Sequence, residues 1–233
     1  MSEWSIRRIN RLFDFTESRN YLEIGVEAGL TFDGIEAERK LAVDPEFEFD
    51  LRERLSPQNT YYQMSSDAFF GRYHEDLLFD VIFLDGLHNF SQTYRDVINA
   101  MEYISPTGFI LIDDVFPSDV YSYNPIMEEA FRERADSVAP QELTDLSWHG
   151  DIFKVIAIIH DYHKNLQYRT FWNGGNAQTL VWWDYDQDRA NRFAGLAEIS
   201  QLSYTDVLMN MEILQIASEE EIWNLLKDLR NED

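Results

Sequence analysis

The chain has 233 residues, of which 45% are hydrophobic, so it is long enough to bury a substantial core as one α/β domain. Its 43 acidic and 19 basic residues give a formal charge of −24, which argues against nucleic acid as a partner because this field repels phosphate backbones. The absence of cysteine excludes disulfides and thiolate metal sites, which leaves carboxylates and five histidines as metal ligands.

No apolar run reaches the ~18 residues that a membrane-spanning helix needs, and the polar residues 1–8 lack the apolar core of a signal peptide. The sequence therefore predicts a cytoplasmic protein with no membrane partner. A salt-rich habitat or simple solubility explains the acidity as well as a function would.

Strand-like and helix-like segments alternate along the first half of the chain. A helix is expected from Ser91, as its N-cap, to about Ile104. Such alternation is typical of βαβ units, whose strands lie parallel in one sheet. The expected strands are residues 21–24, 41–43, 60–64, 80–84 and 108–112.

In the second half, the turn at residues 173–176 predicts an antiparallel hairpin of strands 168–172 and 179–183. A helix is expected from Ile152 to about Lys164, and two more near the C-terminus, the last after a capping box of Ser218 and Glu221. The predicted fold is a Rossmann-like doubly wound sheet, mostly parallel, with terminal helices. We expect one domain over residues 1–190, with a C-terminal helical extension over 191–233 packed on it.

The tryptophans at the end of the second hairpin strand are adjacent in sequence. Because side chains alternate along a strand, Trp182 and Trp183 must point to opposite faces. A core position is the default for such residues, and a subunit interface in a homo-oligomer is the alternative.

Carboxylates follow two of the apolar strands directly. Asp85 follows residues 80–84, and Asp113 and Asp114 follow residues 108–112. Neighbouring strands lie ~4.8 Å apart and open sheets bind ligands at their carboxyl ends, so these acids could converge on one hard cation such as Mg²⁺. Helix capping is the alternative, but it explains three mutually repelling acids poorly.

His88 lies three residues after Asp85, within reach of a substrate held at such a cation. Histidine titrates near neutral pH and suits proton abstraction. A structural or exposed histidine is the alternative reading. His149 is undecided between lining a substrate pocket and tying a helix to the sheet.

The first strand leads into a loop at residues 23–31, where Gly25 and Gly29 let the backbone approach a ligand closely. An ordinary turn between strand and helix explains the glycines equally well. However, Asp44 ends the second strand about 20 residues after Gly25, where dinucleotide-type folds place a ribose-binding acid.

Residues 23–31, 43–45, 85–88 and 112–114 together resemble the class I S-adenosylmethionine-dependent methyltransferases, over roughly residues 21–183. The last two segments, and residues 148–154, resemble the metal-dependent branch that methylates hydroxyl groups of small molecules and sugars. Glu27 is a departure, because many members of the wider superfamily have glycine there.

The resemblance implies an O-methyltransferase that binds S-adenosylmethionine and Mg²⁺ or another divalent cation. Its acceptor would be a small hydroxylated molecule, such as a sugar, natural product or glycan. A nicotinamide-dependent oxidoreductase and a non-catalytic binding protein with the same fold are the alternatives. The implied site comprises cofactor-binding Glu23, Gly25, Gly29, Thr31, Asp44, Ser66 and Asp67, metal-binding Asp85, Asp113 and Asp114, and the general base His88.

Within the cofactor set, the glycines would shape the loop around the methionine part of the cofactor, and Asp44 would accept from the ribose hydroxyls. Ser66 and Asp67 would lie beside the adenine, although a plain turn explains this pair about as well.

Overall fold

A single central sheet organises the part of the chain that the computed structural model describes, residues 2–139, 141–142, 146–185 and 188–231. Its strand order is β3-β2-β1-β4-β5-β7-β6-β8. The strands are β1 (Asn20–Ile24), β2 (Arg39–Asp44), β3 (Asn59–Gln63), β4 (Phe79–Leu84), β5 (Ile104–Ile112), β6 (Leu166–Phe171), β7 (Gln178–Trp183) and β8 (Ile216–Ala217).

Strands β1 to β5 pair in parallel, whereas β7 is antiparallel to both β5 and β6. The short β8 pairs in parallel with β6 at the edge. The predicted fold class, a mostly parallel Rossmann-like sheet with an antiparallel hairpin, is thus confirmed. The carboxyl ends of β1, β2, β4 and β5 lie at one edge of the sheet, where the loops that carry the predicted site residues emerge.

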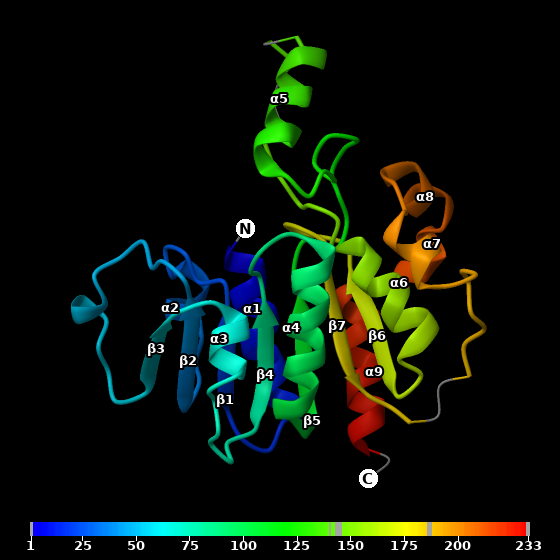
Figure 1. Cartoon of the computed structure of the whole chain (residues 1–233). Coiled ribbons are helices and arrows are strands. Elements are labelled where there is room, and N and C mark those ends of the chain that lie inside the picture. The colour runs from blue at the N-terminus through cyan, green and yellow to red at the C-terminus, as the bar shows by residue number, and fades with distance from the viewer. Residues whose placement is uncertain (1, 140, 143–145, 186–187, 232–233) are drawn as a thin grey trace.

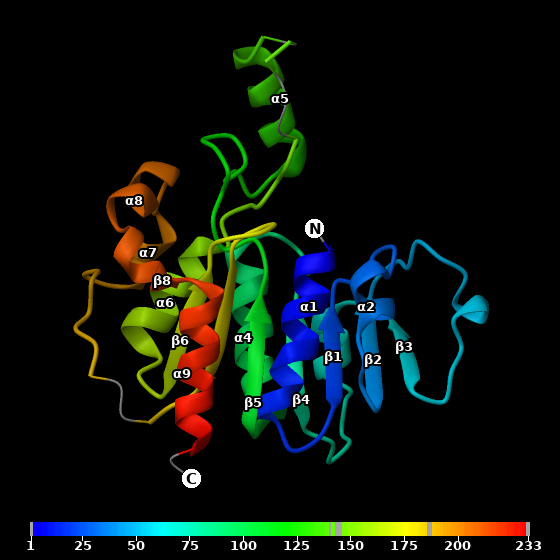
Figure 2. The same ribbon diagram turned by 180° about the vertical axis from the view of Figure 1, so that it is seen from behind.

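Helices cover both faces of this sheet. Figure 1 shows α3, α4 and α6 over one face, and Figure 2 shows α1 and α9 over the other. Side-chain alternation produces two cores, since Ile82 and Leu84 of β4 face one layer while Val81 and Phe83 face the other. The helices are α1 (Ser2–Leu12), α2 (Leu30–Gly34), α3 (Ser66–Phe70), α4 (Phe90–Tyr103), α5 (Met127–Ser137), α6 (Phe153–Tyr162), α7 (Leu196–Ser200), α8 (Tyr204–Met209) and α9 (Glu219–Asn231).

Helix α4 begins two residues earlier than predicted, and its cap is a different residue. The N-cap is Asn89, whose extended backbone lets its side chain accept a hydrogen bond from the amide of Gln92 at 2.9 Å. Ser91 lies inside the helix, and its hydroxyl donates to the Asn89 side chain at 3.1 Å. The prediction of Ser91 as the cap was therefore wrong, because Asn is an equally strong N-cap and precedes it.

The C-terminal region has three helices, α7, α8 and α9, where two were expected. The capping box before α9 is confirmed, since Ser218 and Glu221 exchange side-chain and backbone hydrogen bonds of 3.3 and 2.7 Å. Trp223 of α9 is buried against Phe171 of β6, with ring centroids 5.2 Å apart. Helix α9 therefore packs on the sheet itself, and the boundary at residue 190 stays a prediction.

The two tryptophans of β7 face opposite sides, as predicted. Trp182 is buried in the core beneath α1 and α9, and Trp183 packs against the other core and stacks on Tyr185. Homo-oligomer formation stays a prediction.

The segment between β5 and α6 carries α5 away from the body of the molecule, beyond the carboxyl edge of the sheet (Figure 1). Helices α7 and α8 rise beyond the same edge on the β6 side. Both therefore stand beyond the edge from which the loops that carry the predicted site residues emerge. Among the helices of the described residues, none is both long and apolar enough to cross a membrane.

Candidate active site

The glycine loop after β1 lies directly against the loop after β4. Gly25 has φ +84°, and a Cβ at this position would lie 2.0 Å from the carbonyl oxygen of Asp85. No other residue fits so close an approach between two backbones. The loops that carry the predicted cofactor residues and the predicted metal residues are therefore in contact.

Asp44, at the end of β2, holds this loop in shape. Its Oδ2 accepts hydrogen bonds from the amides of Val26 and Glu27 at 2.7 and 2.9 Å. Glu27 takes φ +48°, the left-handed conformation that glycine adopts freely at such a position. The departure from the glycine pattern thus leaves the loop with a glycine-like backbone, which Asp44 stabilises.

The remaining predicted cofactor residues after β1 lie below and beside this loop. Glu23 is buried and accepts a 2.6 Å hydrogen bond from the Tyr21 hydroxyl, while burial raises the pKa of Glu23 well above its ordinary value. Gly29, at φ +74°, lies under the ring of Phe49 and the guanidinium of Arg54. Thr31 is partly exposed in the first turn of α2.

Ser66 and Asp67 both accept hydrogen bonds from the side chain of Gln92, which was not predicted as a site residue. The amide nitrogen of Gln92 in α4 lies 3.1 Å from both Ser66 Oγ and Asp67 Oδ1, and 3.0 Å from Asp96 Oδ1. Gln92 and Asp96 are four residues apart, so they share one face of the helix predicted there. That spacing is the only sequence signal that could have found them.

Asp96 is buried in this cluster. Burial raises the pKa of Asp96 to about 6 from 3.8, against the opposing effect of its hydrogen bonds with Ser66 and Gln92. Because the folded state binds the proton more tightly than the unfolded state, the protonated carboxyl stabilises the fold fully below about pH 4. This contribution disappears as the pH rises through about 6.

We therefore expect Asp96→Asn, which keeps an acceptor for Gln92, to be stabilised relative to the wild type as the pH rises. The advantage in free energy of unfolding should grow by about 1 kcal/mol between pH 5 and pH 8. Chemical denaturation of the cofactor-free protein at both pH values measures it. A pH-independent difference between the two proteins would contradict this assignment, and Asp76→Asn, at an exposed position, is the control.

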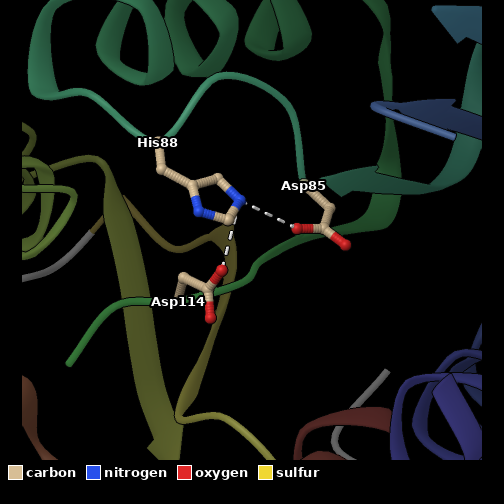
Figure 3. Close-up of side chains that lie close together, drawn as sticks. All are labelled: Asp85, His88 and Asp114. Atoms are coloured by element: carbon tan, nitrogen blue, oxygen red, sulfur yellow. Dashed lines mark ion pairs between the residues drawn. The ribbon is translucent and has the colours of Figure 1, made fainter. Parts of the chain in front are cut away.

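Three predicted residues converge beyond the ends of β4 and β5, as Figure 3 shows. The Nε2 atom of His88 lies 3.5 Å from Asp85 Oδ1 and 3.2 Å from Asp114 Oδ2. One ligand atom from each of the three residues lies within 4.8 Å of the others. This set of two carboxylates and one imidazole could hold a divalent cation.

A segment after α5 fixes the orientation of His88. The Nδ1 atom of His88 donates to the carbonyl of Trp148 at 3.1 Å, since a carbonyl can only accept. The Trp148 ring stacks on the imidazole, with ring centroids 4.9 Å apart. Gly150, at φ +61°, passes so close to the His88 carbonyl that a Cβ would lie 1.6 Å from its oxygen. Asp151 accepts from the amide of Phe90 at 2.7 Å. The Nε2 atom is thus left facing the two carboxylates.

The charges in this group are strongly coupled. Burial alone lowers the pKa of His88, but its hydrogen bond to Asp85 and the negative charges of Asp114 and Asp85 outweigh burial and raise the pKa to about 9. Burial and the charge of Asp113 raise the pKa of Asp114 well above its ordinary value. A positive charge between the carboxylates therefore stabilises the group, whether it is a proton on His88 or a bound cation.

Asp113 does not join the close group. It is buried, and its carboxylate accepts from the amide of Asp114 at 2.8 Å and from the side chain of Gln178 in β7. Burial and the charge of Asp85 raise the pKa of Asp113 to about 7. Asp114 takes φ +56° and accepts a hydrogen bond from Asn176 in the hairpin turn. The turn thus supports Asp114 from the side of β7.

His149 lies near the same group, with Nε2 3.7 Å from Asp114 Oδ1. The sequence reasoning had no signal for Asn176 or Gln178, and had assigned no role to Trp148 or Gly150. Asn176 and Gln178 come from the distant hairpin and follow no motif spacing, whereas Trp148 and Gly150 lie in residues 148–154, for which the sequence indicated only a resemblance.

Comparisons with known proteins agree with the fold that positions these residues. Residues 22–115 match the family described as "Methyltransferase domain". A structure from Klebsiella pneumoniae assigned as an O-methyltransferase is 17% identical, with a TM-score of 0.53 over 79% of this chain and 81% of that chain. No curated protein matches the sequence.

Two further structures contain S-adenosylhomocysteine. The O-methyltransferase of Bacillus cereus is 14% identical, with a TM-score of 0.52 over 78% of this chain and 80% of that one. A methyltransferase of Podospora anserina is 13% identical, with a TM-score of 0.50 over 78% and 77%. At these identities the likeness shows the fold, and the family match over β1 to β5 agrees with it.

Proposed function

We propose that this chain, a class I S-adenosylmethionine-dependent methyltransferase, transfers the methyl group to a hydroxyl oxygen of a small acceptor such as a sugar, a natural product or a glycan. The observation that carries the proposal is the convergence of Asp85, His88 and Asp114 beside the glycine loop. A base and a cation site at this edge suit the activation of a hydroxyl. A nicotinamide-dependent oxidoreductase would have no use for this group.

The cofactor is proposed to lie along the loops after β1, β2 and β3. The Gly25 and Gly29 loop would surround its methionine part, with Glu23 and Thr31 beside it, and Asp44 would accept from the ribose hydroxyls. Asp44 is partly exposed, and its Oδ2 already holds the loop through two amides. Its Oδ1 accepts from the amide of Glu46 at 2.8 Å and has a second lone pair for a hydroxyl. Ser66 and Asp67, tied to Gln92, would face the adenine.

Asp44→Ala should weaken S-adenosylhomocysteine binding by about 1.5–3 kcal/mol, since it removes hydrogen bonds to a charged acceptor. Titration calorimetry measures this, with Asp76→Ala, at an exposed carboxylate away from the loop, as the control. Absence of heat with both S-adenosyl compounds, together with tight NADH binding by the wild type, would reject the cofactor assignment.

The residues of the group fit a divalent cation. Asp85 and Asp114 offer the carboxylate oxygens that suit Mg²⁺ and Mn²⁺. We propose that Asp85 and Asp114 hold the cation and that Asp113, which lies outside the group, fixes Asp114 through its amide. When bound, the cation would lower the pKa of the acceptor hydroxyl.

In the Asp85→Asn/Asp114→Asn variant, Mn²⁺ binding and methyl transfer should both be lost, because neutral amides do not balance a divalent charge. S-adenosylhomocysteine affinity should stay nearly unchanged. Calorimetry and a turnover assay measure the two effects. The Asp14→Asn/Asp76→Asn variant removes two exposed carboxylates and is the control for net charge. Full wild-type turnover after exhaustive chelation would contradict the role of a cation.

The Nε2 atom of His88 is proposed to accept the proton of the acceptor hydroxyl. The oxygen then forms a bond to the methyl carbon as the sulfonium–carbon bond breaks, leaving S-adenosylhomocysteine. The imidazolium that results is stabilised by the Trp148 carbonyl at Nδ1 and by the carboxylates of Asp85 and Asp114. Holding both reactants in line supplies a further part of the rate.

His88→Ala should lower the rate of methyl transfer by ~10²–10⁴-fold, the usual range for a general base, with S-adenosylhomocysteine affinity nearly unchanged. The exposed His74→Ala is the matched control. Single-turnover kinetics with the true acceptor are the measurement, and wild-type turnover in the His88 variant would refute the base assignment.

The acceptor class is tested by screening hydroxylated small molecules for the release of S-adenosylhomocysteine. Turnover of sugars or other alcohols supports the proposal. Methylation of RNA, in spite of the −24 charge, with none of the small molecules would overturn it.

A further inference from the structure

The N-terminal helix α1 contributes a fully buried arginine, Arg8, which contacts the hairpin of β6 and β7. Arg8 has no exposed surface. Its Nη1 donates to the side-chain oxygen of Gln178 at 2.8 Å, and its Nη2 to the carbonyls of Asn173 and Gly174 at 2.6 and 3.2 Å. Its Nε donates to Glu219 of α9 at 3.0 Å. One guanidinium thus joins α1, α9, strand β7 and the hairpin turn.

Trp4 of α1 packs against the same turn. Gly174 has φ +86°, and a Cβ there would lie 2.4 Å from the Trp4 ring, so the turn packs tightly on α1. Two residues further on, Asn176 donates to Asp114. The turn that Arg8 holds therefore carries the side chain that supports Asp114.

A second connection leads from Arg8 to Asp113. Gln178 is buried, and its side-chain amide nitrogen donates to the hydroxyl of Ser5 in α1 at 2.7 Å. The same side chain is also hydrogen-bonded to Asp113. Because Arg8 holds the amide oxygen, the nitrogen of Gln178 is directed to Ser5 and Asp113. Arg8 also interacts with Asp113 through its positive charge.

We propose that Arg8 is a positioning residue for Asp113 and Asp114. It fixes the orientation of the Asp114 side chain through the hairpin turn and Asn176, and that of Asp113 through Gln178. This inference rests on the proposed function, in which Asp114 binds the cation. Arg8 touches neither cation nor acceptor and acts only through these neighbours.

The chemistry of arginine suits this place. The planar guanidinium donates in several fixed directions at once, which a lysine ammonium on a flexible stem does not reproduce. A buried charge is tolerated only where it is fully paired, and Arg8 has Glu219 and three oxygen acceptors. A lysine at this position would keep the charge but lose the simultaneous contacts.

The neighbouring Arg7 provides a matched control. It is half-exposed, binds the same Glu219 carboxylate at 2.7 Å and lies over the Trp4 ring, but among the described residues its side chain makes no hydrogen bond to the turn or to Gln178. Comparison of Arg8→Met, Arg8→Lys and Arg7→Met therefore separates positioning of the turn from the general ion pairing of α1 with α9.

Three quantities are measured on the full chain: Mn²⁺ affinity by calorimetry, S-adenosylhomocysteine affinity, and amide hydrogen exchange over residues 173–178. Both Arg8 variants should bind Mn²⁺ about 10–100-fold more weakly, the usual effect of losing a residue that orients metal ligands. They should also exchange faster over residues 173–178 and bind S-adenosylhomocysteine as the wild type does. Arg7→Met should match the wild type in all three.

Equal Mn²⁺ affinity in wild type and Arg8 variants overturns the inference and leaves the proposed function standing. If the wild type itself binds no Mn²⁺, the proposed cation site is wrong, and this role of Arg8 with it. Should the Arg8 variants not fold, Asn176→Ala removes only the last contact of the turn with Asp114. It should show the same loss of Mn²⁺ affinity at an unchanged melting temperature, and wild-type affinity in that variant also overturns the inference.

Discussion

The constraint on which the site depends is that two carboxylates share one imidazole nitrogen. Asp85 and Asp114 come from neighbouring strands, and their side chains both face Nε2 of His88. Like charges at this distance repel each other strongly in a partly buried place, so the arrangement needs a positive charge between them. The fold meets this need by fixing His88 through Nδ1, since the Trp148 carbonyl leaves Nε2 as the only nitrogen that can face the carboxylates.

Two non-glycine residues at the carboxyl edge adopt left-handed backbone conformations, Glu27 in the cofactor loop and Asp114 after β5. Such conformations are unfavourable for most side chains and persist where the surroundings fix them. Asp44 holds the amide of Glu27, and Asp113 holds the amide of Asp114. At each place an acidic side chain therefore stabilises the backbone as well as supplying charge to the site.

The sheet was predictable because its strands are apolar runs bounded by turn residues, and the hairpin because residues 173–176 have the composition of a tight turn. The convergence of Asp85 and Asp114 was predictable because the parallel order brings the carboxyl ends of β4 and β5 together. Helix α1 was not predicted, because residues 1–8 are mostly polar, although Ile9 and Leu12 are buried on its inner face. The roles of Arg8, Trp148 and Asn176 could not be predicted, because each depends on contacts between segments far apart in the chain.

The loop that carries Asp85 and His88 is in close backbone contact on two sides. Gly25 of the cofactor loop lies against the carbonyl of Asp85, and Gly150 lies against the carbonyl of His88. A side chain at either glycine would have to displace a backbone oxygen, so both positions are set by close approach and not by the chemistry of a side chain. Because one contact comes from the proposed methyl-donor loop and the other from the Trp148 segment, a shift in either reaches the loop that carries His88, the proposed base. The position of His88 relative to the glycine loop is thus fixed by backbone packing, which varies less than the reach of flexible side chains.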